Sequence, residues 1–195
     1  GSSVVDAYSR ALAADPISAF GGVLISNQPI TSEATELLHE LFFEILIAPD
    51  FEPEALHVLT QKKNRILLQQ KPFHSPVKST RSILNGSLEQ DFDLKTVTGD
   101  DLNVKTNITP SKQELSDLLF ANIIVKHTKS NAIALVKNNQ LLASGTGQTS
   151  RVDALNQAIQ KAKTFGFDLH GAVMASDAFF PFPDCVEIAH SVGIN

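Results

Sequence analysis

Residues 44–69, EILIAPDFEPEALHVLTQKKNRILLQ, are the part of the sequence that most clearly predicts the fold. They begin with the short apolar run Glu44–Ala48, which is typical of a buried strand. Pro53 follows at a position where proline opens a helix, because the first helical turn has no use for its missing N–H. Residues 65–69 form a second strand-like run. The order strand, helix, strand predicts a βαβ unit with two parallel strands in one sheet.

The same alternation extends toward the N-terminus. Apolar spacing predicts an amphipathic helix over residues 4–12, a short buried strand over residues 23–25 and a second helix over residues 31–43. Residues 1–70 therefore predict a layered α/β sheet whose strands run parallel.

Residues 70–110 interrupt this alternation. They contain Pro72, Pro76, Gly86, Gly99 and Pro110, together with one strand-like run at residues 81–89. We interpret this segment as the connection between two lobes. The predicted division is a first α/β lobe at residues 1–75, a connecting region at residues 76–110 and a second α/β lobe at residues 111–195.

The second half resumes an α/β pattern. Residues 111–126 predict a helix, and residues 131–137 and 140–144 predict two strands. A tight Asn138-Asn139 turn joins these strands, so they should be antiparallel. The remaining elements are a helix near residues 151–165, a strand at residues 171–175 and a helix at residues 183–191. Because Ile194-Asn195 resembles the start of another strand, we expect the natural chain to continue.

Composition excludes several classes of protein. The net charge is -5 and the pI is about 5.6, so the basic footprint of a nucleic-acid-binding protein is missing. No run approaches the roughly 20 apolar residues of a membrane span. The single cysteine, Cys185, fits a reducing cytoplasm, where we expect the protein to work. One cysteine and six scattered histidines do not form a zinc motif. The initial Gly-Ser-Ser is either a tag remnant or native sequence.

Several motifs allow both a functional and a structural interpretation. Gly145–Ser150 precedes a helix, where free N–H groups bind anions, but it equally fits an ordinary loop. Lys126-His127 is either a general base or structural. Asn131 is either a hydrogen-bonding residue at a strand end or a polarising donor. Ser176–Phe182, with three phenylalanines beside Pro181, is either a core plug or an apolar wall for a flat ligand.

Taken together, these motifs resemble a known family. The segments are DPISAFGG at residues 15–22, KSNAI at residues 129–133, GTGQTSRV at residues 145–152 and MASDAFFPF at residues 174–182. In this order and spacing they resemble the transformylase domain of the bifunctional purine-synthesis enzymes that formylate 5-aminoimidazole-4-carboxamide ribonucleotide (AICAR). The resemblance extends over essentially residues 4–195.

The resemblance implies a two-lobed αβα domain with a cytidine-deaminase-like fold and no zinc. It implies formyl transfer from 10-formyltetrahydrofolate to the AICAR amine, and a separate domain that closes the ring to inosine monophosphate (IMP). It also implies a homodimer with active sites at the subunit interface, and small-molecule partners rather than nucleic acid or membrane.

The resemblance also assigns roles to individual residues. Asn131 corresponds to the catalytic residue that polarises the formyl group. The AICAR base is expected against Phe20, Gly21 and Glu44. The folate side is expected at Ile17, Arg151, Val152, Phe179 and Pro181. A monovalent cation, K+, is expected near Thr128, Ser130 and Asp177.

The sequence also departs from the family pattern. The family's catalytic Lys-His pair precedes the segment with which this sequence begins, and its late Arg and His near the nucleotide are absent. Pro183 and Cys185 replace residues that are commonly Arg and a small or amide residue. We therefore expect the chain alone to be inactive. It is either part of an enzyme or an inactive fragment that keeps the fold as a binding or dimerisation module.

Overall fold

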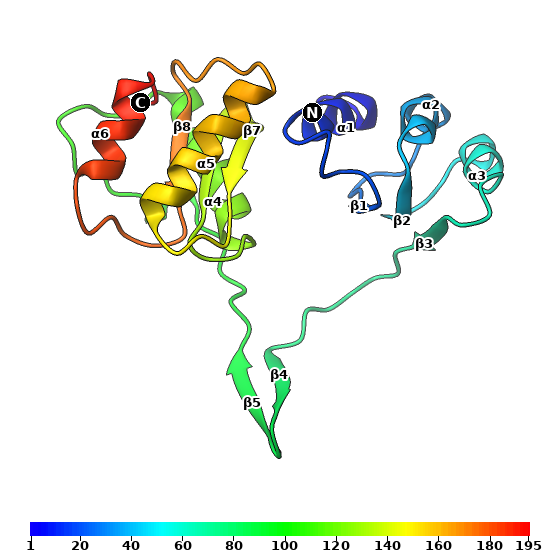
Figure 1. Ribbon diagram of the computed structural model, residues 1–195. Coiled ribbons are helices and arrows are strands. Elements are labelled where there is room, and N and C mark those ends of the chain that lie inside the picture. The colour runs from blue at the N-terminus through cyan, green and yellow to red at the C-terminus, as the bar shows by residue number, and fades with distance from the viewer.

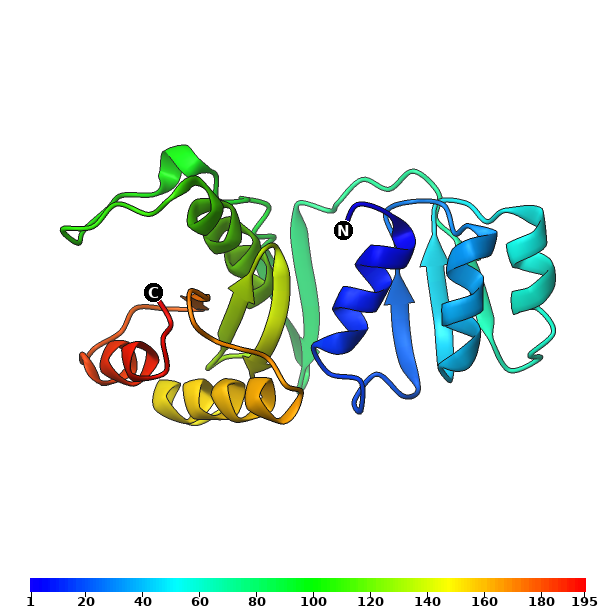
Figure 2. The ribbon, with the colours of Figure 1, turned by 90° about the horizontal axis from the view of Figure 1, so that it is seen from above.

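The computed structural model describes residues 1–195, and its first sheet contains three parallel strands in the order β1-β2-β3. The strands are β1 (Gly22–Ile25), β2 (Phe43–Ala48) and β3 (Ile66–Gln69). The helices α1 (Val4–Ala13), α2 (Ser32–Glu40) and α3 (Pro53–Leu59) alternate with them and lie on one face of the sheet (Figures 1 and 2). The parallel βαβ arrangement predicted from residues 44–69 is confirmed. Residues 4–69 are called the first lobe below.

Local capping explains where these helices begin. The Ser3 hydroxyl accepts a hydrogen bond from the Asp6 N–H, and the Thr31 hydroxyl accepts one from the Ala34 N–H. The prediction that the second helix reaches residue 43 is wrong, because α2 ends at Glu40. Phe43 instead begins β2, where its side chain is completely buried in the first-lobe core.

The first sheet keeps one apolar face uncovered. On the central strand, Ile45 pairs with Val23 and Ile66, and Ile47 pairs with Ile25 and Leu68. These six residues form what we call the open sheet face. The core cluster lies on the other side, beneath the helices, while Val23, Ile25, Ile66 and Leu68 are exposed. Parallel sheets are usually covered on both faces, so this surface has the character of a contact surface.

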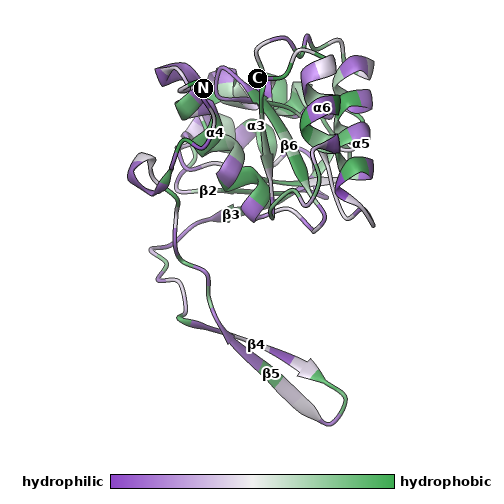
Figure 3. Ribbon diagram, turned by 90° about the vertical axis from the view of Figure 1, so that its left-hand side faces the viewer, coloured by the Kyte–Doolittle hydropathy of each residue, from purple (hydrophilic) through white to green (hydrophobic).

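A β-hairpin projects away from both lobes (Figures 1 and 3). It consists of β4 (Lys78–Ile83) and β5 (Gly86–Asp91), which are antiparallel, and we call it the arm. The prediction of a single strand at residues 81–89 is wrong, since the chain reverses at Leu84-Asn85. The first turn position is Leu84, with a φ of 44°, whereas tight two-residue hairpin turns usually carry Asn, Asp or Gly there.

The second lobe, residues 112–194, has helices on both faces of its sheet. The strands β6 (Ile133–Lys137), β7 (Gln140–Gly145) and β8 (Val173–Ser176) lie in the order β7-β6-β8 and are antiparallel. Helix α4 (Lys112–Lys126) packs on β6 and β8, and α5 (Arg151–Thr164) packs on β7 and β6. Helix α6 (Asp184–Ser191) packs on α5, and a 3-10 turn, η1 (Gly99–Asp101), precedes α4.

Strand β6 shows why this lobe is layered. Ile133 and Leu135 belong to the core cluster that contains α5 residues, whereas Ala134 and Val136 pack with residues of α4. Alternation of side chains along the strand therefore fills the space on both sides of the sheet. The α/β class is confirmed, whereas the likeness to a cytidine-deaminase-like fold and the domain boundaries stay predictions. No helix in the chain is both long and apolar enough to cross a membrane.

The turn between β6 and β7 is fixed by a buried carboxylate. Asn138 and Asn139 have φ values of 54° and 55°, as a tight two-residue hairpin turn requires. Asp117 of α4 is only 2% exposed, and its oxygens accept hydrogen bonds from the Asn138 N–H (2.9 Å) and the Asn139 N–H (2.6 Å). The antiparallel pair predicted from the Asn138-Asn139 turn is confirmed.

Gly145 provides a test of the packing between β7 and α5. A Cβ atom at this position would lie 1.8 Å from the Ala154 carbonyl oxygen, which is backbone and cannot move aside alone. We expect Gly145→Ala to destabilise the second lobe by about 1–3 kcal/mol or more, as overpacking does. The measurement is the free energy of unfolding in urea. Gly86→Ala is the control, since its nearest atom would be 3.9 Å away. Equal stability of the two variants would contradict this packing.

Candidate functional site

The side chain of Asp177 joins three separate segments of the second lobe. Its Oδ1 accepts a hydrogen bond from the Ala132 N–H (2.9 Å), just before β6, and its Oδ2 accepts one from the Ser130 hydroxyl (2.5 Å). The guanidinium of Arg151, the first residue of α5, lies 3.5 Å from Oδ1. Asp177 itself directly follows β8. The carboxylate therefore ties the end of β8 to the start of β6 and to the start of α5.

Arg151 is held by two groups rather than extended into solvent. Its Nε donates to the Ser176 hydroxyl (2.8 Å), in addition to the ion pair with Asp177. The Arg151 side chain is 17% exposed and that of Asp177 is 13% exposed. A charge-assisted pair that is largely desolvated is stronger than a surface pair. Arg151 therefore presents a fixed positive group at the beginning of α5.

The electrostatics of the cluster favour ionised Asp177. Burial raises the pKa of this carboxyl, but the hydrogen bonds from Ser130 and Ala132 and the charge of Arg151 outweigh that effect. The net result is a pKa below the ordinary value of 3.8. Asp177 is therefore an anion at neutral pH.

Asn131 is fixed by the loop between β7 and α5. Its Nδ2 donates to the Gln148 carbonyl (3.0 Å) and the Thr149 carbonyl (3.3 Å), and its backbone N–H also donates to Gln148. The peptide bond between Ser130 and Asn131 is cis. The side-chain oxygen accepts no hydrogen bond from the chain. These bonds fix the orientation of the amide. Its Nδ2 can donate a hydrogen bond to a ligand only when one of the two side-chain hydrogen bonds breaks.

The loop of residues 145–150 uses its N–H groups within the protein. The Thr146 N–H donates to the side chain of Gln157, the Gly147 N–H to the Lys129 carbonyl and the Gln148 N–H to the Asn131 carbonyl. The Ser150 hydroxyl caps α5 by accepting from the Asp153 N–H. These contacts favour the structural interpretation of the loop over an open anion cradle, because the N–H groups of residues 146–148 already have partners.

Thr128, Ser130 and Asp177 line one open pocket of about 380 Å³. The Thr128 hydroxyl donates to the Ile124 carbonyl (2.7 Å) and the Ser130 hydroxyl donates to Asp177, so both oxygens keep lone pairs free. Asp93 and Lys126 line the same pocket, and the Lys126 ammonium lies 3.4 Å from Asp93. No three His, Cys, Asp or Glu side chains are grouped to hold a metal ion.

The residues expected around the AICAR base lie in the first lobe. Phe20 is 71% exposed, and its ring centroid is 5.0 Å from that of Phe42. The Gly21 N–H donates to the Phe42 carbonyl (2.9 Å), and Glu44 is exposed near the start of β2. The three residues therefore gather at the amino-terminal ends of β1 and β2. Ile17 is exposed in the preceding loop.

The Phe-rich segment after β8 agrees in part with each of its two interpretations, a core plug and an apolar wall for a flat ligand. Phe180 packs against the second-lobe core, as a core plug would. Phe179 and Phe182 are 79% and 68% exposed, and Pro181 is also exposed, as expected of an apolar wall. Val152 is half-buried and packs against the same core, so its side chain has a structural role as well.

Within one chain, the structure brings Ser130, Asn131, Arg151 and Asp177 together, but it does not join them to Phe20 and its neighbours. No hydrogen bond, ion pair or aromatic contact links the two groups. Their convergence on one cleft stays a prediction. Sequence reasoning missed the Ser176 hydroxyl and the Gln148 and Thr149 carbonyls. Ser176 lies inside the MASDAFFPF motif, whereas the carbonyls have no sequence signature because every residue carries one.

Comparison with known proteins agrees with the resemblance that the sequence motifs carry. The profile of the AICARFT/IMPCHase bienzyme family matches residues 1–161. The chain is 60% identical over 193 residues to the bifunctional purine biosynthesis protein PurH of Bacteroides thetaiotaomicron, covering 99% of this chain and 38% of the relative. PurH of Aquifex aeolicus is 47% identical over 195 residues, covering 100% of this chain and 38% of the relative. The chain thus spans about 38% of the length of these relatives.

The role of Asp177 predicts a specific pH dependence of stability. Folding lowers the pKa of Asp177, so the ionised carboxylate makes its full contribution to the stability of the fold above the ordinary pKa of 3.8. That contribution is lost as pH falls through the lower pKa of the folded state. We expect Asp177→Asn to lower the free energy of unfolding by about 1–3 kcal/mol at pH 7. The difference from the unsubstituted chain should shrink below pH 4. Urea unfolding at pH 7, 5 and 3.5 measures this.

Asp91→Asn is the matched control, because Asp91 is exposed at the end of β5 and has no side-chain partner. It should leave the free energy of unfolding unchanged at all three pH values. A difference for Asp177→Asn that stays constant across this pH range would contradict the assigned ionic role.

Proposed function

Because this chain belongs to the AICARFT/IMPCHase bienzyme family, we propose that it supplies part of the site that transfers formyl from 10-formyltetrahydrofolate to the amine of AICAR. The observation that carries the proposal is the cluster around Asp177. It holds the Asn131 loop, Arg151 and the start of the Phe179 segment against one another in the second lobe. The whole reaction belongs to IMP synthesis.

The chemistry explains why such a cluster is useful. The AICAR amine is a poor nucleophile, because its lone pair delocalises into the imidazole and the carboxamide. Formyl transfer therefore depends on close positioning of the two reactants and on donors directed at the developing oxyanion. The amide of Asn131 is an uncharged donor, so it can serve a dry site without leaving a buried charge unpaired. In this proposal Asn131 polarises the formyl group.

The two substrates would use different lobes. Phe20, Gly21 and Glu44 of the first lobe are proposed to hold the AICAR base. The pterin of the folate is flat, and the exposed Phe179 ring beside Pro181 suits its face. Arg151 supplies a fixed positive charge on the folate side, supported by its two contacts with Ser176 and Asp177.

The Asp177 pocket is also proposed to hold K+. The hydroxyls of Thr128 and Ser130 and the ionised carboxylate of Asp177 are oxygen ligands, which a hard cation prefers. All three line the same pocket, and the ammonium groups of Lys95 and Lys126, which line it as well, are paired with Asp101 and Asp93. A cation there would stabilise the loop that carries Asn131, since Ser130 is its neighbour in the chain.

The Asp177 cluster offers no side chain that could act as the acid or base in formyl transfer. The amine must lose a proton as it attacks, and a positioned acid or base typically contributes about 10²–10⁴-fold. The Asp177 cluster contains no histidine, and His127 is exposed at the end of α4 without a side-chain hydrogen bond. We therefore propose that the acid–base group lies in the rest of the longer family protein.

The first functional prediction compares two proteins. The 195-residue chain should have no measurable formyl transfer, whereas a full-length family protein that contains this sequence should be active. In that longer protein Asn131→Ala should lower kcat by about 10²–10³-fold, the loss expected for one oxyanion donor. The measurement is steady-state formyl transfer to AICAR. Asn156→Ala, at an exposed position on α5, is the control.

The outcomes separate the alternatives. Equal turnover of the chain and the longer protein would rule out a need for an external acid–base group. No turnover from the longer protein would favour the second candidate function, an inactive module that keeps the fold for binding or dimerisation. The exposed apolar residues of the arm favour that candidate, because an inactive module would still use them for association.

We also propose that the chain forms a homodimer through the arm. A two-stranded hairpin is at best marginally stable alone, and this one carries the exposed side chains of Ile83, Leu84 and Leu88. Leu84 is fully exposed at a φ of 44°, a backbone conformation that branched apolar residues rarely adopt. A second copy of the chain would give these side chains the apolar contact that this copy lacks.

Leu84→Asp tests the proposed interface. Aspartate adopts positive φ more readily than leucine, so the hairpin itself should be preserved. We expect the dimer to dissociate at least about tenfold more readily, because a charge replaces a buried apolar side chain. Sedimentation velocity over a range of concentrations measures this. Ser87→Asp, an equally exposed polar position in the same hairpin, should have a smaller effect. An unchanged dimer, or a monomeric unsubstituted chain, would contradict the interface.

A further inference from the structure

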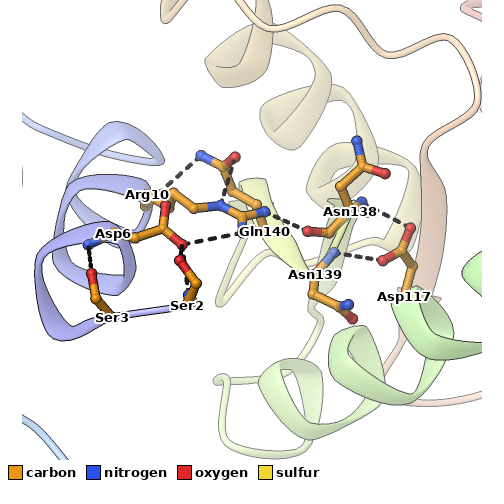
Figure 4. A network of polar contacts seen from close by, with 8 residues as sticks. All are labelled: Ser2, Ser3, Asp6, Arg10, Asp117, Asn138, Asn139 and Gln140. Carbon is orange, nitrogen blue, oxygen red and sulfur yellow. Dashed lines mark hydrogen bonds and ion pairs between the residues drawn. The ribbon is translucent and has the colours of Figure 1, made fainter.

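Four polar contacts join the lobes near the carboxyl-terminal end of α1. The carboxylate of Asp15 lies 2.5 Å from the ammonium of Lys161 on α5. Arg10 Nε donates to the Gln140 side chain (3.4 Å), and Gln140 donates back to the Arg10 carbonyl (3.1 Å). Arg10 also donates to the Asn138 carbonyl (Figure 4). We call these five residues, Arg10, Asp15, Asn138, Gln140 and Lys161, the lobe latch.

Each half of the latch is anchored within its own lobe. The Asn138-Asn139 turn is fixed by the buried carboxylate of Asp117, so the carbonyl that Arg10 contacts cannot move freely (Figure 4). Asp6, one helical turn before Arg10, lies 3.9 Å from its guanidinium and helps to orient it. Asp15 also accepts a hydrogen bond from the Ser18 N–H (2.9 Å). Residues on both sides of the latch are therefore held by further contacts within their own lobe.

The covalent connection between the lobes does not fix their relative orientation. The segment of residues 70–110 is almost entirely exposed and packs into neither core. A long extended segment of this kind leaves the lobes free to change their relative orientation. Helix α1 packs against β7, and the latch fixes that contact through directed hydrogen bonds and an ion pair.

The latch joins the two elements that lead to the two groups of site residues. Asp15 and Ser18 form the start of the loop that leads to Phe20 and Gly21, on the proposed AICAR side. Lys161 belongs to the helix that begins with Arg151, on the proposed folate side. A displacement of one lobe relative to the other would therefore change the placement of one group of site residues relative to the other.

We propose that Arg10, Asp15 and Lys161 are positioning residues that hold the two lobes, and with them the two groups of site residues, in a fixed relative orientation. This inference rests on the proposed function. Misplacement of reactants by about 1 Å can cost about 10²-fold in rate. Ion pairs as exposed as this one, with Lys161 38% and Asp15 25% exposed, contribute little to stability. The latch should therefore affect catalysis much more than folding.

The test uses a full-length family protein that contains this sequence, with Lys161→Met, Lys161→Arg and Lys163→Met variants. Lys161→Met should lower kcat about 10–100-fold, because only alignment is lost. The KM for each substrate should change less, and the melting temperature should fall by no more than about 2 °C. Lys161→Arg keeps the ion pair and should restore kcat. Lys163→Met, on an exposed position of the same helix, should have no effect.

A second readout is independent of activity. Spin labels at Glu54→Cys and Asn156→Cys, which are exposed on α3 and α5, report the distance between the lobes, and Cys185 is buried. Lys161→Met should broaden this distance distribution, whereas Lys161→Arg should not. Asp15→Asn should act in the same way as Lys161→Met, and combining the two should add nothing further, because both break one contact.

The outcomes decide the inference. If Lys161→Met resembles Lys163→Met in both kcat and distance distribution, the latch has no positioning role. A loss of kcat without a broader distance distribution would assign Lys161 a direct role and overturn the proposal. If the unsubstituted longer protein transfers no formyl group, the proposed function fails. The distance distribution would then still decide whether the latch sets the orientation of the lobes.

Discussion

The carboxylate of Asp177 is the contact on which the arrangement of the second lobe depends. It accepts hydrogen bonds from Ser130 and from the Ala132 N–H, and it pairs with Arg151. These groups come from the loop before β6 and from the start of α5. An ionised, largely buried carboxylate is stable only while such partners surround it. The same contacts that keep Asp177 charged therefore fix the positions of Asn131 and Arg151.

The two lobes differ in how completely their sheets are covered. In the second lobe α4 and α5 fill both faces of the sheet, so its site residues rest on a rigid support. In the first lobe one apolar face remains open, and the arm is exposed except at Ser79, which is half-buried. The chain spans about 38% of the length of its relatives. Relative placement of the lobes depends on a small number of polar contacts around α1.

Much of the candidate site was predictable, because the residues cluster in motifs that resemble a family. Thr128, Ser130 and Asp177 were expected together, and they line one pocket. The geometry adds constraints that motifs cannot carry. The Asn131 amide already has two carbonyl partners, and the N–H groups of residues 146–148 are paired within the chain. Such contacts depend on backbone groups, which leave no trace in the sequence.

Outside the arm, the sequence by itself determined the order of helices and strands, the parallel first sheet and the antiparallel β6–β7 pair. These features follow from periodicity, caps and turn residues, which act over a few neighbouring residues. The arm was missed because its turn carries Leu84 at a conformation that the residue type disfavours. Only the tertiary structure decided that Asp177 meets Ala132 across 45 residues and that Asp15 meets Lys161 across 146 residues. Such partners are chosen by the packing of whole elements, because no local pattern relates residues so far apart in the chain.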